Sequence, residues 1–487
     1  MKRPVVCLLL EGTYPYVRGG VSSWTHQLIT SLPEIDFYLF TLSPDPYQTP
    51  AYDLPDNVVG SRDIVIMPDG FELVENAASR TVSGAVMQDR IAQLRALYPS
   101  GRDPAVDGIL NELETVARLR AERRSRWRAN FHGILPGYDG GPWLRAFVRL
   151  WSDIVGNHLT NNPYYGMGEY FWTWYNSRVT LLILLNESLP PADVYHSLCT
   201  GYAGFLAARA RAETGKPFLL TEHGIYHRER IIEIQSTSEL RGHQRDQWSD
   251  MFLALSRVSY RSADRIITLF DANQKLELAM GAPASRATVI PNGIDIERFF
   301  GITRTPRPGV HVGLVGRVVP IKDIKTFLVA ARIISETVPN VTFWMVGPTD
   351  EAPDYFEECR DMVHAFGLDE QVVFTGAVDV REYYAFLDVL TLTSLSEAQP
   401  LVILEAVAAG IPCVATRVGD VPELLNHDER LIAAPKDAEG IARRIARICT
   451  HPEEYTDWVR ERQTAVRRHY DRSEIFRRYG ELYREAG

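Results

Sequence analysis

The chain has 487 residues, of which 45% are apolar and 23% are charged, and its formal net charge is −10. This length is too great for one ordinary core and predicts two large domains. The acidic balance argues against broad binding to nucleic acid, which requires a basic face that neutralises phosphates. No apolar run approaches the roughly 20 residues that span a bilayer, so we expect a soluble globular protein.

The N-terminal segment is predicted to form the first strand of a sheet. The apolar run at residues 5–10 is too short for the core of an export signal, and Glu11 and Gly12 end it without a small-residue cleavage site. The cysteines show neither metal-ligand spacing nor a disulfide framework, which favours a cytosolic protein. They are Cys7, Cys199, Cys359, Cys413 and Cys449.

From about residue 310 the chain alternates short apolar runs with helical patterns. Regular alternation of this kind predicts a parallel, doubly wound α/β sheet that binds ligands outside the carboxyl ends of its strands. Arg317, Gly347, Gly376 and Glu397 fall at those ends, and we expect one crevice to collect them. The predicted strands are residues 311–316, 341–346, 372–375, 389–393 and 412–416.

The first half predicts a similar sheet, interrupted by a helical insertion at residues 75 to about 185. Aromatic residues are frequent there, including Trp143, Trp151 and residues 171–175. They could stack on sugar rings or fill a core, and both interpretations stay open. The basic cluster at residues 118–128 fits an exposed helix face, or a surface that docks on a membrane or a partner. The predicted strands are residues 5–10, 37–41, 63–67, 193–197, 217–221, 265–269 and 287–290.

A domain boundary is predicted between residues 295 and 308, where residues 302–309 have the composition of a linker. The N-terminal Rossmann-like domain would then comprise residues 1–300. The C-terminal Rossmann-like domain would comprise residues 309–452. The helices of residues 453–487 are expected to cross back to the first domain.

Two carboxylates, Glu397 and Glu405, stand eight positions apart around the start of a predicted helix. Residues 389–393 precede them as a buried strand, and Pro400 is predicted to be the first helical residue. Backbone N–H groups at a helix start favour an anion such as a diphosphate, and the carboxylates can accept hydrogen bonds from sugar hydroxyls. The layout suits a sugar nucleotide, with a solvated acidic pair as the alternative.

Arg317 and Lys322 are predicted to share one strand-to-helix loop of the same sheet. Two cations in such a loop can neutralise a leaving diphosphate, an effect worth roughly 3–4 kcal/mol for each well-placed group. Each of them taken singly also fits an ordinary surface charge.

The first half offers weaker signals. Gly19 and Gly20 stand at a predicted strand–loop–helix junction, where a main chain without side chains can approach a phosphate or a sugar, although a simple turn explains them equally well. His196 and His223 end apolar runs and should open toward the crevice, although a lone histidine is often structural. Residues 291–295 form a Pro-Asn-Gly-Ile-Asp segment that also fits a turn.

Together these motifs resemble the retaining glycosyltransferases of family 4, which have the GT-B architecture of two facing Rossmann-like domains. The resemblance spans nearly the whole chain and is specific in combination. Residues 11–24 look more narrowly like the subgroup that assembles bacterial Pel exopolysaccharide. The matching elements are Glu397 and Glu405 with the family's E-x7-E element, Arg317 and Lys322 with its diphosphate-binding pair, Gly19 and Gly20 with its glycine loop, and residues 291–295 with its P-N-G-[IV]-D segment.

The resemblance implies that the first domain lies on the acceptor side and that the second binds the nucleotide sugar. It also implies roles for individual residues. Glu405 would bind the ribose hydroxyls, Glu397 the hexose of the sugar donor, and Arg317 with Lys322 the diphosphate. His223 would face the transferred sugar.

The resemblance also implies main-chain contacts. Groups near Val378 would hold the base, while Gln399, Pro400 and Leu401 would meet the sugar or the phosphate. Many relatives have glycine and then Phe or Leu after the first glutamate, where this chain has Ala398 and Gln399, so the contour around the hexose stays open.

The family is expected to retain configuration at the anomeric carbon by front-face attack assisted by the departing diphosphate. The residues agree in two respects: no convincing enzymic nucleophile and no Asp-x-Asp triplet that would clamp a metal is evident. We therefore expect no cofactor and no metal requirement.

The leading hypothesis is transfer of a hexosyl unit from a UDP-sugar, with UDP-glucose as the first guess, to a growing polysaccharide. A UDP-sugar epimerase of the same fold and a non-catalytic nucleotide-sugar-binding component of a synthase complex are the alternatives; a phosphorylase would require a pyridoxal-phosphate lysine. The expected location is the cytoplasm, and an inner-membrane polysaccharide synthase complex is a candidate partner.

Overall fold

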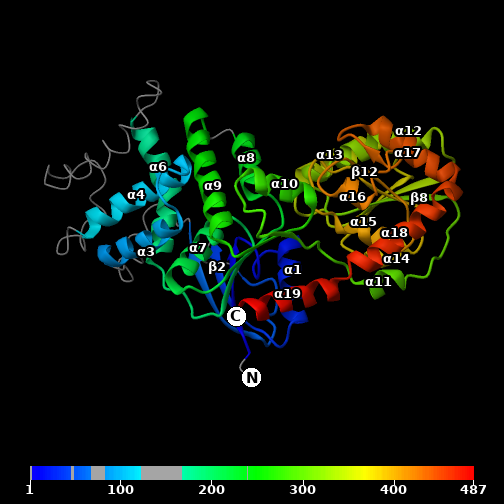
Figure 1. The fold of residues 1–487 in the computed structure, drawn as a ribbon. Coiled ribbons are helices and arrows are strands. Elements are labelled where there is room, and N and C mark those ends of the chain that lie inside the picture. Colours follow the sequence, from blue (N-terminus) through cyan, green and yellow to red (C-terminus); the bar gives the residue numbers. More distant parts are fainter. Residues whose placement is uncertain (1–2, 45–48, 67–82, 122–166, 238–239) are drawn as a thin grey trace. The chain divides into compact units, whose positions relative to one another are not determined.

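The computed structural model describes residues 3–44, 49–66, 83–121, 167–237 and 240–487. Trp143, Trp151 and the part of the basic cluster at residues 122–128 lie outside these ranges. No helix within them is both long and apolar enough to cross a lipid bilayer. The chain divides into two compact units (Figure 1): unit 1 holds residues 1–268, 274–288 and 479–487, and unit 2 holds residues 269–273 and 289–478.

Each unit contains a doubly wound parallel sheet, which confirms the predicted fold class. In the described part of unit 1, seven strands lie in the order β3-β2-β1-β4-β5-β6-β7, and the pairings from β3 to β6 are parallel. The strand order reverses between β1 and β4, and the carboxyl ends of strands at such a switch point are where doubly wound sheets bind ligands. The strands are β1 (Val5–Glu11), β2 (Asp36–Ser43), β3 (Val58–Val65), β4 (Val194–Ser197), β5 (Phe218–Glu222), β6 (Arg265–Thr268) and β7 (Ala287–Val289).

Continuous apolar runs form the central strands of unit 1 because helices cover both faces of the sheet. The helices of the insertion, α3, α4 and α6, pack against α7 and α9. The helices of unit 1 are α1 (Gly20–Ser31), α3 (Gly84–Leu97), α4 (Pro104–Ala121), α6 (Met167–Asn186), α7 (Tyr202–Thr214), α8 (Tyr226–Ser236), α9 (Gly242–Ser262) and α10 (Asp271–Ala279), the last of which begins in unit 2.

One aromatic residue of the insertion has a clear place in the core of unit 1. Trp174 is 6% exposed, and its indole Nε1 donates a hydrogen bond to Glu112 at 3.1 Å. The side chains of Phe171, Trp172 and Tyr175 are outside the described part. For Trp174 the core interpretation holds.

The sheet of unit 2 has six strands in the order β10-β9-β8-β11-β12-β13, all parallel. Its order reverses between β8 and β11. The sequence missed β13, because two residues are too few to give a strand pattern. The strands are β8 (Val310–Val315), β9 (Val341–Val346), β10 (Val372–Gly376), β11 (Val389–Leu392), β12 (Cys413–Thr416) and β13 (Ile432–Ala433).

Amphipathic helices cover this sheet, and α12 packs against α17. The helices are α11 (Ile296–Phe300), α12 (Ile324–Ser335), α13 (Pro353–Ala365), α14 (Val380–Tyr384), α15 (Leu401–Ala408), α16 (Val421–Leu424), α17 (Ala438–Thr450), α18 (Thr456–His469) and α19 (Arg472–Ala486), with 3-10 turns η3 (Pro320–Lys322) and η4 (Pro452–Tyr455).

Apart from the short stretch at residues 269–273, the chain enters unit 2 at Val289, upstream of the predicted linker at residues 302–309. The reason is packing: Ile294, Ile296 and Phe299 are buried in the core of unit 2. At the other end, the last turns of α19 from Tyr479 onward belong to unit 1.

Candidate functional site

Lys322 and Glu397 form an ion pair at the carboxyl edge of the sheet of unit 2. Lys322 ends η3 after β8, and Glu397 lies in the loop after β11, so both stand where the strand order reverses. The Lys322 Nζ lies 2.5 Å from Glu397 Oε1, which also accepts a hydrogen bond from Ser394 Oγ at 2.6 Å. Both side chains of the pair are largely buried. Lys322 of the predicted cationic loop and Glu397 of the predicted crevice therefore touch.

Arg317 is held by a carboxylate that the sequence did not single out. Its Nη1 lies 2.5 and 2.6 Å from the two carboxylate oxygens of Glu351, and both side chains are about half exposed. Glu351 lies in the loop between β9 and α13, next to the loop that carries Arg317. Gly347 permits this closeness, because an added Cβ would lie 2.1 Å from the carbonyl oxygen of Gly316.

Glu405 lies in the second turn of α15 and accepts a hydrogen bond from the hydroxyl of Tyr384 at 3.1 Å. Burial raises the pKa of Glu405, while the Tyr384 hydroxyl opposes that rise. The helix starts one residue later than predicted: Pro400 is the N-cap with extended backbone at ψ 103°, and Leu401 is the first helical residue.

Gln399 uses its side chain within the protein. It is 7% exposed; its Oε1 accepts from the backbone N–H of Asn292 at 2.7 Å, and its Nε2 donates to Asp420 at 2.6 Å. Val378, by contrast, is 41% exposed just beyond β10. Of these two predicted contact residues, one is thus bonded within the protein and the other is an open apolar residue.

In unit 1, Gly19 caps α1 and Gly20 is its first residue, as the strand–loop–helix prediction requires. An added Cβ at either glycine would meet no atom within 4 Å, so the main chain is open there. The ring of Trp24 meets the ring of His223 edge to face at 4.7 Å. His223 is 8% exposed, its Nε2 has no hydrogen-bond partner within the described ranges, and burial lowers its pKa to about 4. Its imidazole is therefore neutral at physiological pH.

The prediction that His196 opens toward a crevice is wrong. His196 is fully buried; Nδ1 bonds to the hydroxyl of Tyr483 at 2.7 Å and Nε2 to that of Thr221 at 2.9 Å. Both ring nitrogens are thereby used in the core, and burial lowers the pKa of His196 to about 3.

Glu11 is a residue of this region that sequence reasoning missed. It ends β1, and its carboxylate accepts from the Tyr226 hydroxyl at 2.6 Å and from the backbone N–H of Ala203 near the start of α7 at 3.2 Å. A carboxylate at the carboxyl end of the first strand was the available signal. These contacts fix the start of the loop that leads to the glycine pair.

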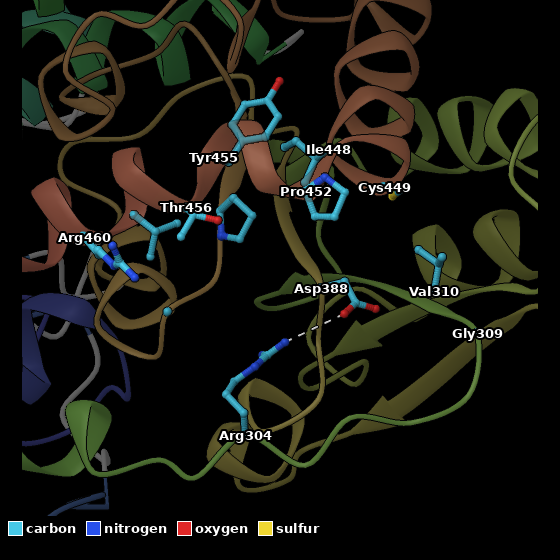
Figure 2. Close-up of a pocket in the computed structure, with 13 residues that line it drawn as sticks. Arg304, Gly309, Val310, Asp388, Ile448, Cys449, Pro452, Tyr455, Thr456 and Arg460 are labelled. Carbon is cyan, nitrogen blue, oxygen red and sulfur yellow. Dashed lines mark ion pairs between the residues drawn. The ribbon is translucent and has the colours of Figure 1, made fainter.

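A separate cavity of about 420 Å³ lies at the opposite, amino edge of the sheet of unit 2 (Figure 2). Val310 begins β8 and Asp388 immediately precedes β11 there, and Arg304 lies 3.8 Å from Asp388. Figure 2 shows the hydroxyl of Tyr455 directed away from that ion pair. This cavity is therefore distinct from the edge that carries Lys322.

Within the described ranges, no three His, Cys, Asp or Glu side chains are grouped as metal ligands. Independence from metal stays a prediction.

The architecture of two Rossmann-like units is that of GT-B proteins. The crystal structure of Anabaena HepE in complex with UDP-glucose superimposes with a TM-score of 0.55 and 16% identity, covering 99% of this chain and 100% of HepE. At this identity the likeness shows the fold.

Family models then identify the chain. It belongs to the family described as "Domain of unknown function (DUF3492)", whose model matches residues 4–285, and residues 309–451 match the model described as "Glycosyl transferases group 1". The second unit thus carries a group 1 glycosyltransferase domain.

Two relatives illustrate how far the similarity extends. D-inositol 3-phosphate glycosyltransferase of Saccharomonospora viridis is 30% identical over 210 residues, which cover 39% of this chain and 48% of the relative. The chain therefore spans about half the length of that relative. The putative teichuronic acid biosynthesis glycosyltransferase TuaC of Bacillus subtilis strain 168 is 25% identical over 380 residues, which cover 74% of this chain and 88% of TuaC.

Proposed function

We propose that the protein is a retaining glycosyltransferase of family 4 that moves a hexosyl unit from a UDP-sugar to a growing bacterial exopolysaccharide. UDP-glucose is the first sugar donor to test. The acceptor proposed is a Pel-like polysaccharide, because residues 11–24 resemble the corresponding segment of PelF.

The observation that carries this proposal is the contact of Lys322 with Glu397 at the switch point of the second sheet. A cation and a carboxylate in contact at that edge offer the two groups that a sugar diphosphate needs, one for phosphate oxygens and one for hexose hydroxyls. The backbone N–H groups at the start of α15 lie in the same loop region and favour an anion.

The sugar donor would exchange partners with the existing ion pairs. Lys322 would turn from Glu397 to a phosphate oxygen, Arg317 would turn from Glu351, and the freed Glu397 would accept hydrogen bonds from the hexose. Charge that develops on the leaving diphosphate would then meet cations already in place, which lowers the barrier to bond cleavage. Glu405 would hold the ribose hydroxyls, and the neutral imidazole of His223 would serve as a hydrogen-bonding group for the sugar.

Two relatives support the choice of substrates. HepE, which shares the fold, was crystallised with UDP-glucose, and TuaC is named for the biosynthesis of a polysaccharide, teichuronic acid. For this chain both substrates are proposals.

The test is incubation of the purified protein with a panel of UDP-sugars while UDP release is followed with and without acceptor oligosaccharides. We expect acceptor-dependent release of UDP that persists in EDTA, since cations of the protein replace a metal. Conversion of UDP-N-acetylglucosamine without an acceptor would instead identify an epimerase. UDP-sugar binding without any turnover would indicate a non-catalytic subunit, and strict dependence on Mg²⁺ or Mn²⁺ would refute the metal-free mechanism.

A further inference from the structure

The loop that carries Glu397 is fastened from two sides by buried polar contacts. On one side Thr416 Oγ1 donates to the carbonyl of Ser394 at 2.6 Å, and the backbone N–H of Asp420 donates to that of Ala398 at 2.9 Å. On the other side the Gln399 amide joins the loop to Asn292. The loop after β12 and the segment that enters unit 2 therefore both contact the Glu397 loop.

Gln399 and Asp420 form the centre of this arrangement. They are 7% and 3% exposed, and Gln399 Nε2 lies 2.6 Å from Asp420 Oδ2. Gly419 lets the two loops meet: its φ is +51°, and an added Cβ would lie 2.2 Å from the carbonyl oxygen of Glu397. A buried, bonded amide–carboxyl pair of this kind fixes the geometry of the groups attached to it.

The hydrogen bonds of this pair depend on the amide of Gln399. Phe or Leu at this position would have no hydrogen-bonding group. The amide makes two hydrogen bonds that such side chains cannot make, one to Asn292 and one to Asp420. Gln399 and Asp420 thus form a polar strut that holds the Glu397 loop.

We propose that Gln399 and Asp420 are positioning residues that orient Glu397 toward the hexose of the sugar donor. The inference rests on the proposed function, in which Glu397 contacts the hexose and Glu405 the ribose. Glu405 lies on α15 and is bonded to Tyr384, outside the strut. Loss of the strut should therefore weaken recognition of the hexose and leave recognition of UDP largely intact.

The experiment compares the affinities of the full chain for UDP and for UDP-glucose by calorimetry. In the wild type we expect UDP-glucose to bind more tightly than UDP by a factor that measures recognition of the hexose. Gln399→Met keeps the side-chain length and removes both hydrogen bonds, so that factor should fall roughly tenfold, in keeping with the loss of hydrogen bonds that hold a charged group. Affinity for UDP alone should change by less than about twofold.

Asp420 supplies a pair of variants with opposite expectations. Asp420→Asn keeps an oxygen that accepts from Gln399 and should preserve the preference for UDP-glucose over UDP. Asp420→Ala removes the acceptor and should reduce that preference as Gln399→Met does. A purely structural role would lower the affinities for both ligands together, or lower only the melting temperature.

The outcomes separate the strut from the proposed function. If the wild type prefers UDP-glucose and Gln399→Met and Asp420→Ala keep that preference unchanged, the strut has no positioning role while the proposed function stands. If Gln399→Met or Asp420→Ala does not fold, hydrogen–deuterium exchange of the Glu397 loop in Asp420→Asn replaces the affinity comparison. Protection equal to that of the wild type then supports the strut, and lost protection overturns it. If the wild type binds neither ligand, the proposed function and the inference both fall.

Discussion

Lys322 and Arg317 are the residues whose charge the proposed reaction needs most. Their partners, Glu397 and Glu351, show that both ammonium and guanidinium groups are within reach of carboxylate oxygens at this edge. A diphosphate oxygen is a chemically similar acceptor with more negative charge.

Replacement of either cation should therefore lower turnover. We expect Arg317→Ala and Lys322→Ala each to reduce UDP release roughly 100- to 1,000-fold, because each removes one preorganised group that stabilises the leaving diphosphate. Circular dichroism should stay as in the wild type. Lys325→Ala is the control, since Lys325 pairs with Glu358 at 2.6 Å on the exposed faces of α12 and α13. Unchanged turnover in both variants would remove the proposed role.

Loss of the Glu351 carboxylate should strengthen ligand binding, in contrast to the loss of either cation. In the ligand-free protein its carboxylate holds Arg317, so it competes with an incoming diphosphate. Glu351→Gln should tighten UDP binding about two- to fivefold, the range that an exposed ion pair supports. Calorimetry measures the change, with Glu358→Gln as a control of similar exposure. Equal affinity in Glu351→Gln and the wild type would contradict the competition.

For single residues, the sequence indicated which side chains gather at the edge of the sheet, because the carboxyl ends of parallel strands share that edge. It could not indicate which residue each of these side chains would bond to. Glu351 joins Arg317 across 34 positions, and Tyr483 joins His196 across 287. The bond to Tyr483 turns a histidine that looked like a ligand into a core residue, since only the folded chain brings the two together.

Among the elements, the loop between β12 and α16 carries Asp420, a buried carboxyl group whose protonation should make the stability of the fold depend on pH. Burial raises the pKa of Asp420 to about 7 from an ordinary value of 3.8, and the hydrogen bond from Gln399 opposes the rise. The folded protein therefore binds this proton more tightly than the unfolded chain does. The free energy of unfolding should fall as pH rises from about 4 toward 7 and level off above that.

Asp420→Asn should remove this dependence while keeping the hydrogen bond. Urea unfolding at pH 8 should find the variant more stable than the wild type by at least about 1 kcal/mol, and the difference should vanish near pH 4. Glu370→Gln, an exposed position in unit 2, is the control. A difference that is the same at both pH values would show that the carboxyl does not titrate in this range.

Most elements were predictable because their cause is local. Buried parallel strands such as β11 and β12 are continuous apolar runs, and their predicted bounds agree with the structure to within a residue. The start of α15 was placed one residue early, because a proline fits both the N-cap and the first helical turn and only its ψ distinguishes them. Nothing local indicated β13, which exists through its pairing with β12.

In the whole molecule, residues 479–487 complete the core of unit 1. Tyr483 is fully buried, and its hydroxyl bonds to His196. Tyr483→Ala should destabilise unit 1 by about 3–5 kcal/mol, because it opens a cavity and leaves a buried histidine nitrogen unpaired. Tyr483→Phe keeps the ring and should cost only about 1–2 kcal/mol.

Hydrogen–deuterium exchange can locate that loss. Tyr483→Ala should speed exchange in β1 and β4 and leave β8 and β11 as in the wild type, since the two units have separate cores. Equal acceleration in both sheets would mean that the units unfold as one.

The place of the C-terminal helix in unit 1 also means that this unit cannot complete its core until the whole chain has been synthesised. Trp24 and Phe37 emerge early from the ribosome, yet the rings that cover them, Tyr479 and Tyr483, are translated only after all of unit 2. The half that is begun first is thus finished last. Until then the rings of Trp24 and Phe37 lack these aromatic partners, and exposed apolar surface of this kind makes a nascent chain prone to aggregation.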